Sequence, residues 1–209
     1  MSVRTRGSLV DMGKVIADIT MSVDGYVTGP GADLEHGLGP DADGLHAWAL
    51  DSDDPVDREL LKSLSADSGA VLMGRKTFDT VDGPGGWNET MGYGATENGR
   101  PPFFVVTSTR PDHVRLAASH DFTFVLDGPA AAVSAARAVA GDHDVYVMGG
   151  GALVAGCLAG GLLDVLRLHV SPEVLGAGTP LFAGVGRHRL VQRDVRVSAV
   201  ATHLTYDVR

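Results

Sequence analysis

Short apolar runs that recur along the first three quarters of the chain constrain its fold most. Each run is too short for a buried helix and ends at polar or glycine residues, which is typical of strands buried on both faces of a sheet. The runs are KVIADITMS (14–22), GAVLMG (69–74), PFFVVTS (102–108), DFTFVL (121–126) and HDVYVM (143–148).

Helical segments lie between some of these runs. DDPVDRELLKSLSAD begins with Asp53 or Asp54 as the N-cap and Pro55 in the first turn, and PAAAVSAARAVAG (129–141) is an alanine-rich helix. Strands that alternate with helices favour a parallel sheet covered on both faces. After Gly161 the remaining strands follow one another without helices, so we expect the sheet to finish antiparallel.

No linker or change in composition divides the chain, so we expect one domain over 13–209, preceded by a disordered extension, 1–12. No apolar run is long enough to span a membrane and no apolar leader opens the sequence, which predicts a cytoplasmic protein. The single cysteine, Cys157, excludes an internal disulfide and a cysteine zinc cluster. Its apolar neighbours predict a buried structural thiol.

The net charge of −9 argues against nucleic acid as a partner, because phosphate backbones bind basic surfaces. A small-molecule substrate fits this negative charge better than nucleic acid does. The long segment after the first strand is strongly acidic, and no Lys or Arg lies between Lys14 and Arg58.

Three consecutive glycines, 149–151, follow the strand at 143–148. A dinucleotide fingerprint GxGxxG fails because Val154 stands at its last position, and a P-loop fails because no Lys-Ser/Thr follows. The remaining interpretation is a bare backbone at a strand-to-helix junction, where amide N–H groups receive a phosphate. Tight packing between helix and sheet would explain one such glycine but not three.

Two further strand ends carry matching chemistry. VLMGRKTF places Arg75, Lys76 and Thr77 at a helix start directly after Gly74, and VVTSTRP ends a strand in hydroxyl residues. Cations at a helix N-terminus oppose the helix dipole, so their presence there favours a bound anion.

These segments resemble the dihydrofolate reductase-like superfamily. ADITMSVDGYVT, VLMGRKTF, FFVVTSTRP, VYVMGGGALV and LLDVLRLHVSPEVLGAGTPLF occur in the order and spacing of that superfamily, over residues 14–208. The segment LGAGTPLF is similar to the reductase domain of riboflavin-biosynthesis deaminase–reductases in its stand-alone form. The resemblance implies an α/β fold of three layers, with a mostly parallel central sheet and antiparallel C-terminal strands. It also implies a cis peptide between Gly149 and Gly150.

The resemblance further implies NADPH as the cofactor, with no metal. Arg75, Lys76 and Thr77 would hold its phosphates, and Ser108 and Thr109 would line the adenosine pocket. The full set of residues implied to bind the cofactor is Gly74, Arg75, Lys76, Thr77, Thr107, Ser108, Thr109, Met148, Gly149, Gly150, Gly151, Ala152 and Leu153.

The sequence signals for substrate binding and catalysis are less specific than those for the cofactor. Hydride transfer needs a proton donor, and Asp57 in the first turn of a helix and Asp24 after the first strand are the candidates. Asp57 also suits the helix dipole, and Asp24 also suits an Asp-Gly turn. Trp48 and Trp87 could form an aromatic wall for a heterocycle.

The resemblance implies a reductase that transfers a hydride to a C=O or C=N bond of a small heterocycle or ribosylaminopyrimidine, of the 5-amino-6-(5-phosphoribosylamino)uracil reductase type. The acidic segment does not suit a phosphorylated substrate, and the sequence contains no deaminase signature H-x-E with P-C-x-x-C. A pterin reductase and a non-catalytic NADPH- or flavin-binding module are the alternatives. We also expect a homodimer whose interface includes residues from 162–172 and 195–208.

Overall fold

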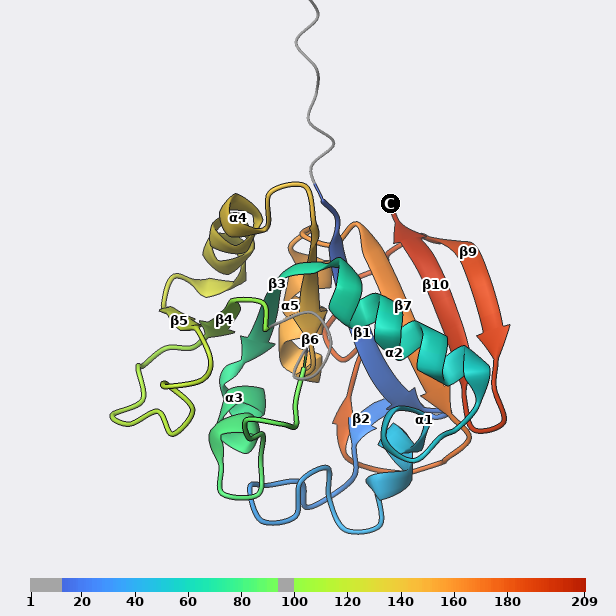
Figure 1. The fold of residues 1–209 in the computed structure, drawn as a ribbon. Helices are drawn as coiled ribbons and strands as arrows, with labels where there is room; N and C mark the ends of the chain where they lie inside the picture. The colour runs from blue at the N-terminus through green and yellow to red at the C-terminus, as the bar shows by residue number, and fades with distance from the viewer. Residues whose placement is uncertain (1–12, 94–99) are drawn as a thin grey trace, which may run out of the picture.

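A central sheet of eight strands organises the protein (Figure 1). The computed structural model describes residues 13–93 and 100–209, so the expected extension, 1–12, lies outside the described residues. The strands are β1 (Val15–Ser22), β3 (Ser68–Gly74), β4 (Phe103–Val106), β5 (Phe122–Val125), β6 (Asp144–Met148), β7 (Val165–Ser171), β9 (Leu190–Val197) and β10 (Thr202–Val208). Their order across the sheet is β5-β4-β3-β6-β1-β7-β10-β9.

The pairing confirms a mostly parallel sheet with an antiparallel end. β5, β4, β3, β6, β1 and β7 are parallel neighbours, whereas β10 runs antiparallel to both β7 and β9. The register of β1 and β7 places Asp18 beside Arg167 and Thr20 beside His169. His169 lies opposite His203 of β10. A row of polar residues therefore crosses three central strands.

Helices cover both faces of this sheet and make the three layers that the sequence predicts. α2 (Pro55–Asp67) and α3 (Arg75–Asp82) lie on one face, and in Figure 1 α2 crosses in front of β1 and β7. α4 (Gly128–Ala140) and α5 (Gly151–Ala159) cover the other face. No helix within residues 13–93 and 100–209 is long and apolar enough to cross a membrane.

The continuous apolar runs follow from burial on both faces. Along β3, Val71 and Met73 pack toward α2 and α3, whereas Ala70 and Leu72 pack toward α4 and α5. Cys157 of α5 is fully buried in the second of these layers, and burial raises the pKa of its thiol to about 11. Its burial among apolar side chains confirms the buried thiol that the sequence predicts.

The start of α2 is fastened to the far end of the sheet. Asp54, rather than Asp53, is the N-cap, because its Oδ1 accepts a hydrogen bond from the Val56 N–H at 2.9 Å. Its other oxygen, Oδ2, accepts from the Ala199 N–H in the turn between β9 and β10, at 3.1 Å. One carboxylate thus fixes the first turn of α2 against β10.

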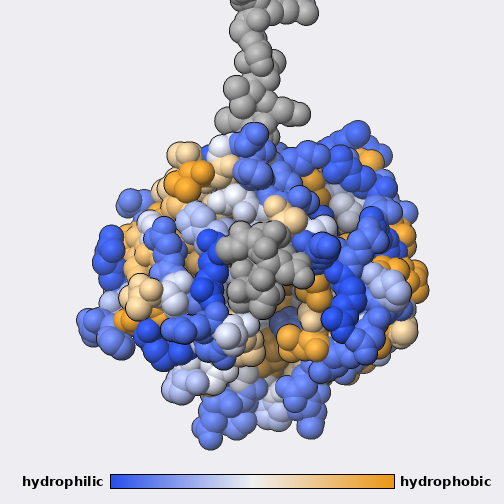
Figure 2. Space-filling model, viewed as in Figure 1, coloured by the Kyte–Doolittle hydropathy of each residue, from blue (hydrophilic) through white to orange (hydrophobic). Residues whose placement is uncertain are grey.

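The long segment after β1 contains more structure than the sequence predicts. It forms a short strand, β2 (Tyr26–Thr28), paired with β8 (Thr179–Pro180), and two helical turns, η1 (Asp43–His46) and α1 (Ala47–Leu50). Trp48 of α1 is buried, and its burial holds these turns against the sheet. Polar residues cover most of the molecular face shown in Figure 2.

Candidate functional site

The predicted phosphate-binding segments meet at one edge of the sheet. β4, β3 and β6 are parallel neighbours, so their carboxyl ends lie side by side. Arg75 Nη1 at the start of α3 donates a hydrogen bond to the Thr109 carbonyl after β4, at 3.0 Å. A Cβ added at Gly150 would lie 3.2 Å from Thr77 Oγ1. The structure therefore brings together the ends of all three strands.

Two helices point their N-termini at this edge without side-chain caps. The N-cap residues of α3 and α5 are Gly74 and Gly150, and neither of these two helix starts has a side-chain cap hydrogen bond. The first N–H groups of a helix have no partner within the helix and carry partial positive charge. Such an edge can accept the oxygens of a phosphate or another anion.

The glycine triple serves two purposes. Gly149 and Gly150 have φ of 65° and 83°, a region that residues with a Cβ rarely adopt. Gly151 has an ordinary φ, but a Cβ there would lie 2.9 Å from Val27 Cγ2, so packing against β2 requires its glycine. The expected cis bond between Gly149 and Gly150 is wrong for this structure, in which the bond is trans. Consecutive positive φ angles turn the bare backbone from β6 into α5 instead.

The two cations of the α3 start differ in their surroundings. Arg75 Nε also donates to Asp79 Oδ1 at 2.7 Å, which orients its guanidinium and shares its charge. Lys76 is exposed. Beside Arg75 lies a groove of about 380 Å³, which runs along α3 toward the loop after β4; its lining includes Phe78, Asp79, Asp82, Pro111 and His113. Three carboxylates, those of Asp79, Asp82 and Asp112, line this groove together with Arg75.

The remaining predicted cofactor residues fall around the same edge. Thr107 is buried, and its hydroxyl donates to the Thr109 carbonyl at 2.8 Å, so it shapes the turn after β4. Ser108 and Thr109 are exposed on that turn. Met148 is half-buried at the end of β6, and on α5 Ala152 is exposed whereas Leu153 is buried against Gly74.

Asp24 fastens a turn. Its carboxylate accepts hydrogen bonds from Ser22 Oγ at 2.6 Å and from the N–H groups of Leu175 and Gly176 at 3.1 Å and 2.7 Å. The hydrogen bond from Ser22 contributes most to a pKa of Asp24 below its ordinary value. An exposed carboxyl that is held ionised is a poor acid, so these contacts favour Asp24 as a fastening between two loops.

Asp57 lies inside the protein. It is wholly buried in the first turn of α2, where Oδ2 accepts from Ser52 Oγ at 2.5 Å and Oδ1 lies 2.8 Å from His203 Nε2. Because Asp57 is fully buried, a substrate cannot touch it in this conformation. Its role as a proton donor stays a prediction, with Ser52, which is half-buried, as its link to the outside.

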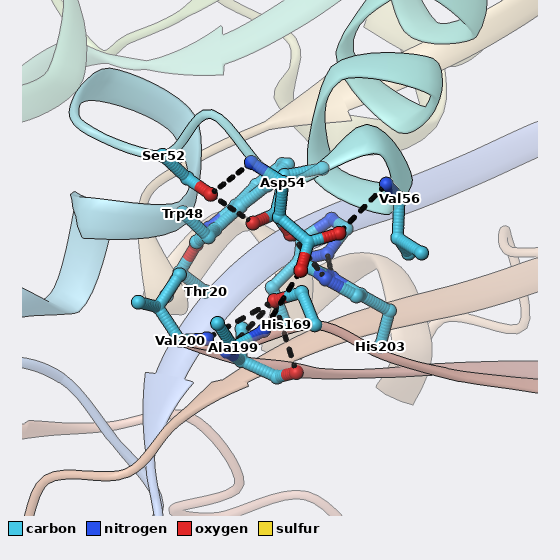
Figure 3. A network of polar contacts seen from close by, with 12 residues as sticks. Thr20, Trp48, Ser52, Asp54, Val56, His169, Ala199, Val200 and His203 are labelled. Atoms are coloured by element: carbon cyan, nitrogen blue, oxygen red, sulfur yellow. Dashed lines mark hydrogen bonds and ion pairs between the residues drawn. The ribbon is translucent and has the colours of Figure 1, made fainter.

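Sequence reasoning missed the chain of polar groups that continues from Asp57. Figure 3 shows its two histidines, His169 and His203, close to Trp48. His203 Nδ1 lies 2.6 Å from His169 Nδ1, and His169 Nε2 lies 2.9 Å from Asp18 Oδ1. Arg167 Nη1 then donates to Asp18 Oδ2 at 3.2 Å. The signal in the sequence was Asp18 in the apolar run of β1 and a histidine in each of β7 and β10, but only the register shows that these residues meet.

The two tryptophans are separated. Trp48 stacks on His169 with ring centroids 3.9 Å apart, and its Nε1–H donates to Thr20 Oγ1 at 2.9 Å. Trp87 packs against Phe103 and His120 over another part of the sheet. The prediction of a common aromatic wall is therefore wrong, and of the two tryptophans only Trp48 contacts the polar chain.

Burial and charge set the protonation of this chain. Burial, followed by positive charge on His169, lowers the pKa of His203. Burial alone would raise the pKa of Asp18, but His169 and Arg167 outweigh it and leave that pKa below its ordinary value. No group of three or more His, Cys, Asp or Glu side chains in the described ranges is arranged to hold a metal ion.

Comparison with known proteins agrees with the fold and with the strand-end motifs. The family model described as the RibD C-terminal domain matches residues 13–206. The chain belongs to this family. A solved structure of a putative riboflavin biosynthesis protein from Shewanella sp. PV-4 is 21% identical with a TM-score of 0.66, and the match covers 94% of this chain and 99% of that one.

Two other solved structures mark the range of the likeness. A diaminohydroxyphosphoribosylaminopyrimidine deaminase/5-amino-6-(5-phosphoribosylamino)uracil reductase from Thermotoga maritima is 15% identical with a TM-score of 0.58; the match covers 95% of this RibD C-terminal domain protein and 57% of that chain. Dihydrofolate reductase from Enterococcus faecalis, complexed with NADP(H) and RAB-propyl, is 15% identical with a TM-score of 0.50, and the match covers 94% of this chain and 97% of that one. These likenesses confirm the dihydrofolate reductase-like fold.

Buried histidines predict that acid destabilises this RibD C-terminal domain protein. Burial lowers the pKa of His46, His120 and His203 below the ordinary 6.5. Below about pH 6.5 the unfolded chain binds protons that the folded protein does not, so the free energy of unfolding falls by up to about 1.4 kcal/mol per pH unit for each group. Denaturant unfolding at about pH 7 and pH 5 measures this loss.

His120→Gln should flatten that pH dependence, because it removes one of the three groups. His143→Gln is the matched control, since the side chain of His143 is 64% exposed, and it should leave the dependence unchanged. A free energy of unfolding that rises from pH 7 to pH 5 would contradict the assigned shifts.

Proposed function

We propose that the protein is an NADPH-dependent reductase that transfers a hydride to a C=O or C=N bond of a small heterocyclic or ribosylaminopyrimidine-type substrate. One observation carries the proposal. Two helix N-termini without side-chain caps, a glycine backbone with positive φ and the exposed Lys76 lie together at the carboxyl edge of the sheet. Membership of the RibD C-terminal domain family supports the reaction class.

The residues present fit a dinucleotide phosphate. Gly149 and Gly150 leave space above Thr77 that side chains would fill, and the N–H groups that begin α5 face it. Arg75 and Lys76 would meet the phosphate on the adenosine ribose, where a carboxylate would instead favour NADH. The groove beside Arg75 would take the adenosine, and the exposed Ser108 and Thr109 lie on the turn that leads to Pro111 of its lining. The Enterococcus faecalis neighbour was solved with NADP(H), which agrees with this choice.

Bound NADPH would supply the hydride, and the chain must then position the acceptor and manage a proton. The ends of β1 and β6 are parallel neighbours, so a nicotinamide beside Gly149 would face the region covered by Trp48. Asp57 lies beneath that region as the proton donor we propose, and Ser52 provides its link to the acceptor. Movement of the turns that carry Trp48 would admit the substrate.

A pterin substrate is the second candidate, and one observation favours it. Residues 15–57 contain no Lys or Arg, so the segment over the acceptor region offers no cation to a substrate phosphate. The Thermotoga maritima neighbour is named for a phosphoribosylamino substrate, which favours the first candidate. Measuring NADPH oxidation with pterins, ribosylaminopyrimidines and their dephosphorylated forms decides between them, and binding without oxidation of any acceptor would indicate a non-catalytic module.

Cofactor preference follows from the cations of α3. We expect NADPH to bind at least about tenfold more tightly than NADH, because a charge-assisted pair with the extra phosphate contributes about 1.5–3 kcal/mol. Lys76→Ala should shrink this ratio without changing NADH affinity. Arg193→Ala on β9, distant from the edge, is the control for a lost cation. Equal affinity of the parent protein for the two cofactors would refute the assignment.

The bare backbone can be tested with a matched glycine pair. Gly150→Ala should abolish cofactor binding, because its Cβ would enter the space above Thr77. Gly161→Ala adds a Cβ at a similar φ of 63°, but no atom lies within 4 Å of it. This variant therefore has the backbone strain of an alanine at positive φ without filling any site. Cofactor titration by fluorescence, with thermal unfolding to confirm folding, compares them. If both variants bound the cofactor equally well, the bare backbone at Gly150 would not be part of the cofactor site.

The proposed homodimer rests on the sheet edge rather than on β7. β7 lies between β1 and β10, so the backbone of 165–171 is enclosed, whereas β9 ends the sheet. Val195 and Val197 of β9 are 44% and 66% exposed. Exposed apolar side chains on an edge strand invite pairing with another chain. We therefore place the interface on β9 and the adjoining part of β10.

Light scattering at micromolar concentration measures the assembly. We expect twice the 21.7 kDa of one chain. Val197→Lys should return the mass to that of one chain, because a buried charge opposes the interface. Val139→Lys, at an exposed site of α4, is the control and should leave the dimer intact. A single-chain mass for the parent protein would refute the dimer.

A further inference from the structure

The buried chain from Asp18 to Asp57 can be counted proton by proton. It contains three contacts: Asp18 Oδ1 with His169 Nε2 at 2.9 Å, the two Nδ1 atoms at 2.6 Å, and His203 Nε2 with Asp57 Oδ1 at 2.8 Å. Each is a hydrogen-bond distance, so each contact requires one proton between its two atoms.

Two neutral imidazoles supply only two of these protons. If both Nε2 atoms carry hydrogen and donate to the carboxylates, the two Nδ1 atoms face each other with lone pairs. Both rings are buried, His169 at 0% and His203 at 3% exposure, so water does not separate them. Unpaired acceptors at 2.6 Å repel strongly in such surroundings. The chain therefore needs a third proton.

We propose that His169 and His203 share one additional proton between their Nδ1 atoms, and that this pair is a proton store for Asp57. His169 and His203 act as positioning residues, since the structure gives neither an exposed path to a substrate. The proton count stands on the geometry alone; the use of the proton in reduction rests on the proposed function.

The groups that face the pair balance its charge. The carboxylates are Asp18 on β1 and Asp57 on α2, and the cation is Arg167 on β7. His46 of η1 and Tyr146 of β6 lie close enough to interact with this set, and both are neutral at pH 7 because burial lowers the pKa of His46 and raises that of Tyr146 to about 12. Two negative charges thus meet Arg167 and one shared proton. The lowered pKa of His203 agrees with a pair that accepts one extra proton and resists a second.

The stored proton can reach Asp57 without loss of a contact. The hydrogen on His203 Nε2 moves to Asp57 Oδ1, and the shared proton stays on His203 Nδ1 and donates to the lone pair of His169 Nδ1. Asp57 is then a carboxylic acid and both rings are neutral. When hydride arrives at the acceptor carbon, Asp57 and Ser52 can deliver that proton to the acceptor heteroatom, and a proton from water restores the pair.

NMR of the ligand-free protein with ¹⁵N-labelled histidine tests the proton count. At about pH 7.5, three of the four ring nitrogens of His169 and His203 should carry hydrogen, and the exposed rings of His36 and His143 supply reference signals from outside the chain of contacts. Two hydrogens on the pair, or four, would overturn the store. This measurement needs neither cofactor nor turnover, so it stays separate from the test of reductase activity.

His203→Gln distinguishes storage of a proton by His203 from a purely structural hydrogen bond to Asp57. Glutamine can still donate to Asp57 but holds no extra proton, so His169 should return to a single N–H, and kcat should fall at least tenfold, most at high pH, where water supplies protons poorly. His143→Gln should change neither. An unchanged kcat and pH profile in a folded His203→Gln protein would overturn the store for Asp57. If that variant fails to fold, His169→Gln replaces it, with a single N–H expected on His203 and the same fall in kcat.

Discussion

Parallel pairing of β4, β3, β6 and β1 is the constraint on which the rest of the structure depends. It sends four strand ends to one edge and forces the chain to leave each end through a helix or loop on the same side. Two of those helices begin there without side-chain caps. An edge that collects unpaired N–H groups and exposed cations is suited to anions, so the cofactor site we propose follows from the topology before any single contact is considered.

The other half of the sheet carries buried polar side chains rather than a binding edge. β1, β7 and β10 carry a row of charged and imidazole side chains across a face that α2 and Trp48 bury. Buried charge is tolerated only when it is paired, and here two carboxylates, a guanidinium and the histidine pair satisfy one another. Removing one member would leave its partner unpaired inside the protein, so the five side chains behave as a unit.

Local sequence patterns predicted a helix or strand well where a single local signal, such as an apolar run or a proline, determines it. The apolar runs became β1 and β3–β6, Pro55 began α2, and the three predicted strand ends met at one edge. Three-dimensional contacts were needed to choose Asp54 over Asp53 as the N-cap. They were also needed to assign a role to each of the three glycines. Gly151 serves packing against Val27, whereas Gly149 and Gly150 serve backbone conformation. The histidine pair could not be predicted, because its members are 34 residues apart and meet only through the antiparallel register of β7 and β10.

The central claim is that the glycine backbone and the α3 cations hold one NADPH molecule. A crystal structure with bound NADP⁺ tests it most directly. The account predicts that the diphosphate lies against the N–H groups following Gly149 and Gly150, with the ribose phosphate between Arg75 and Lys76. A cofactor bound at the opposite edge of the sheet, or with its diphosphate away from the start of α5, would contradict the account.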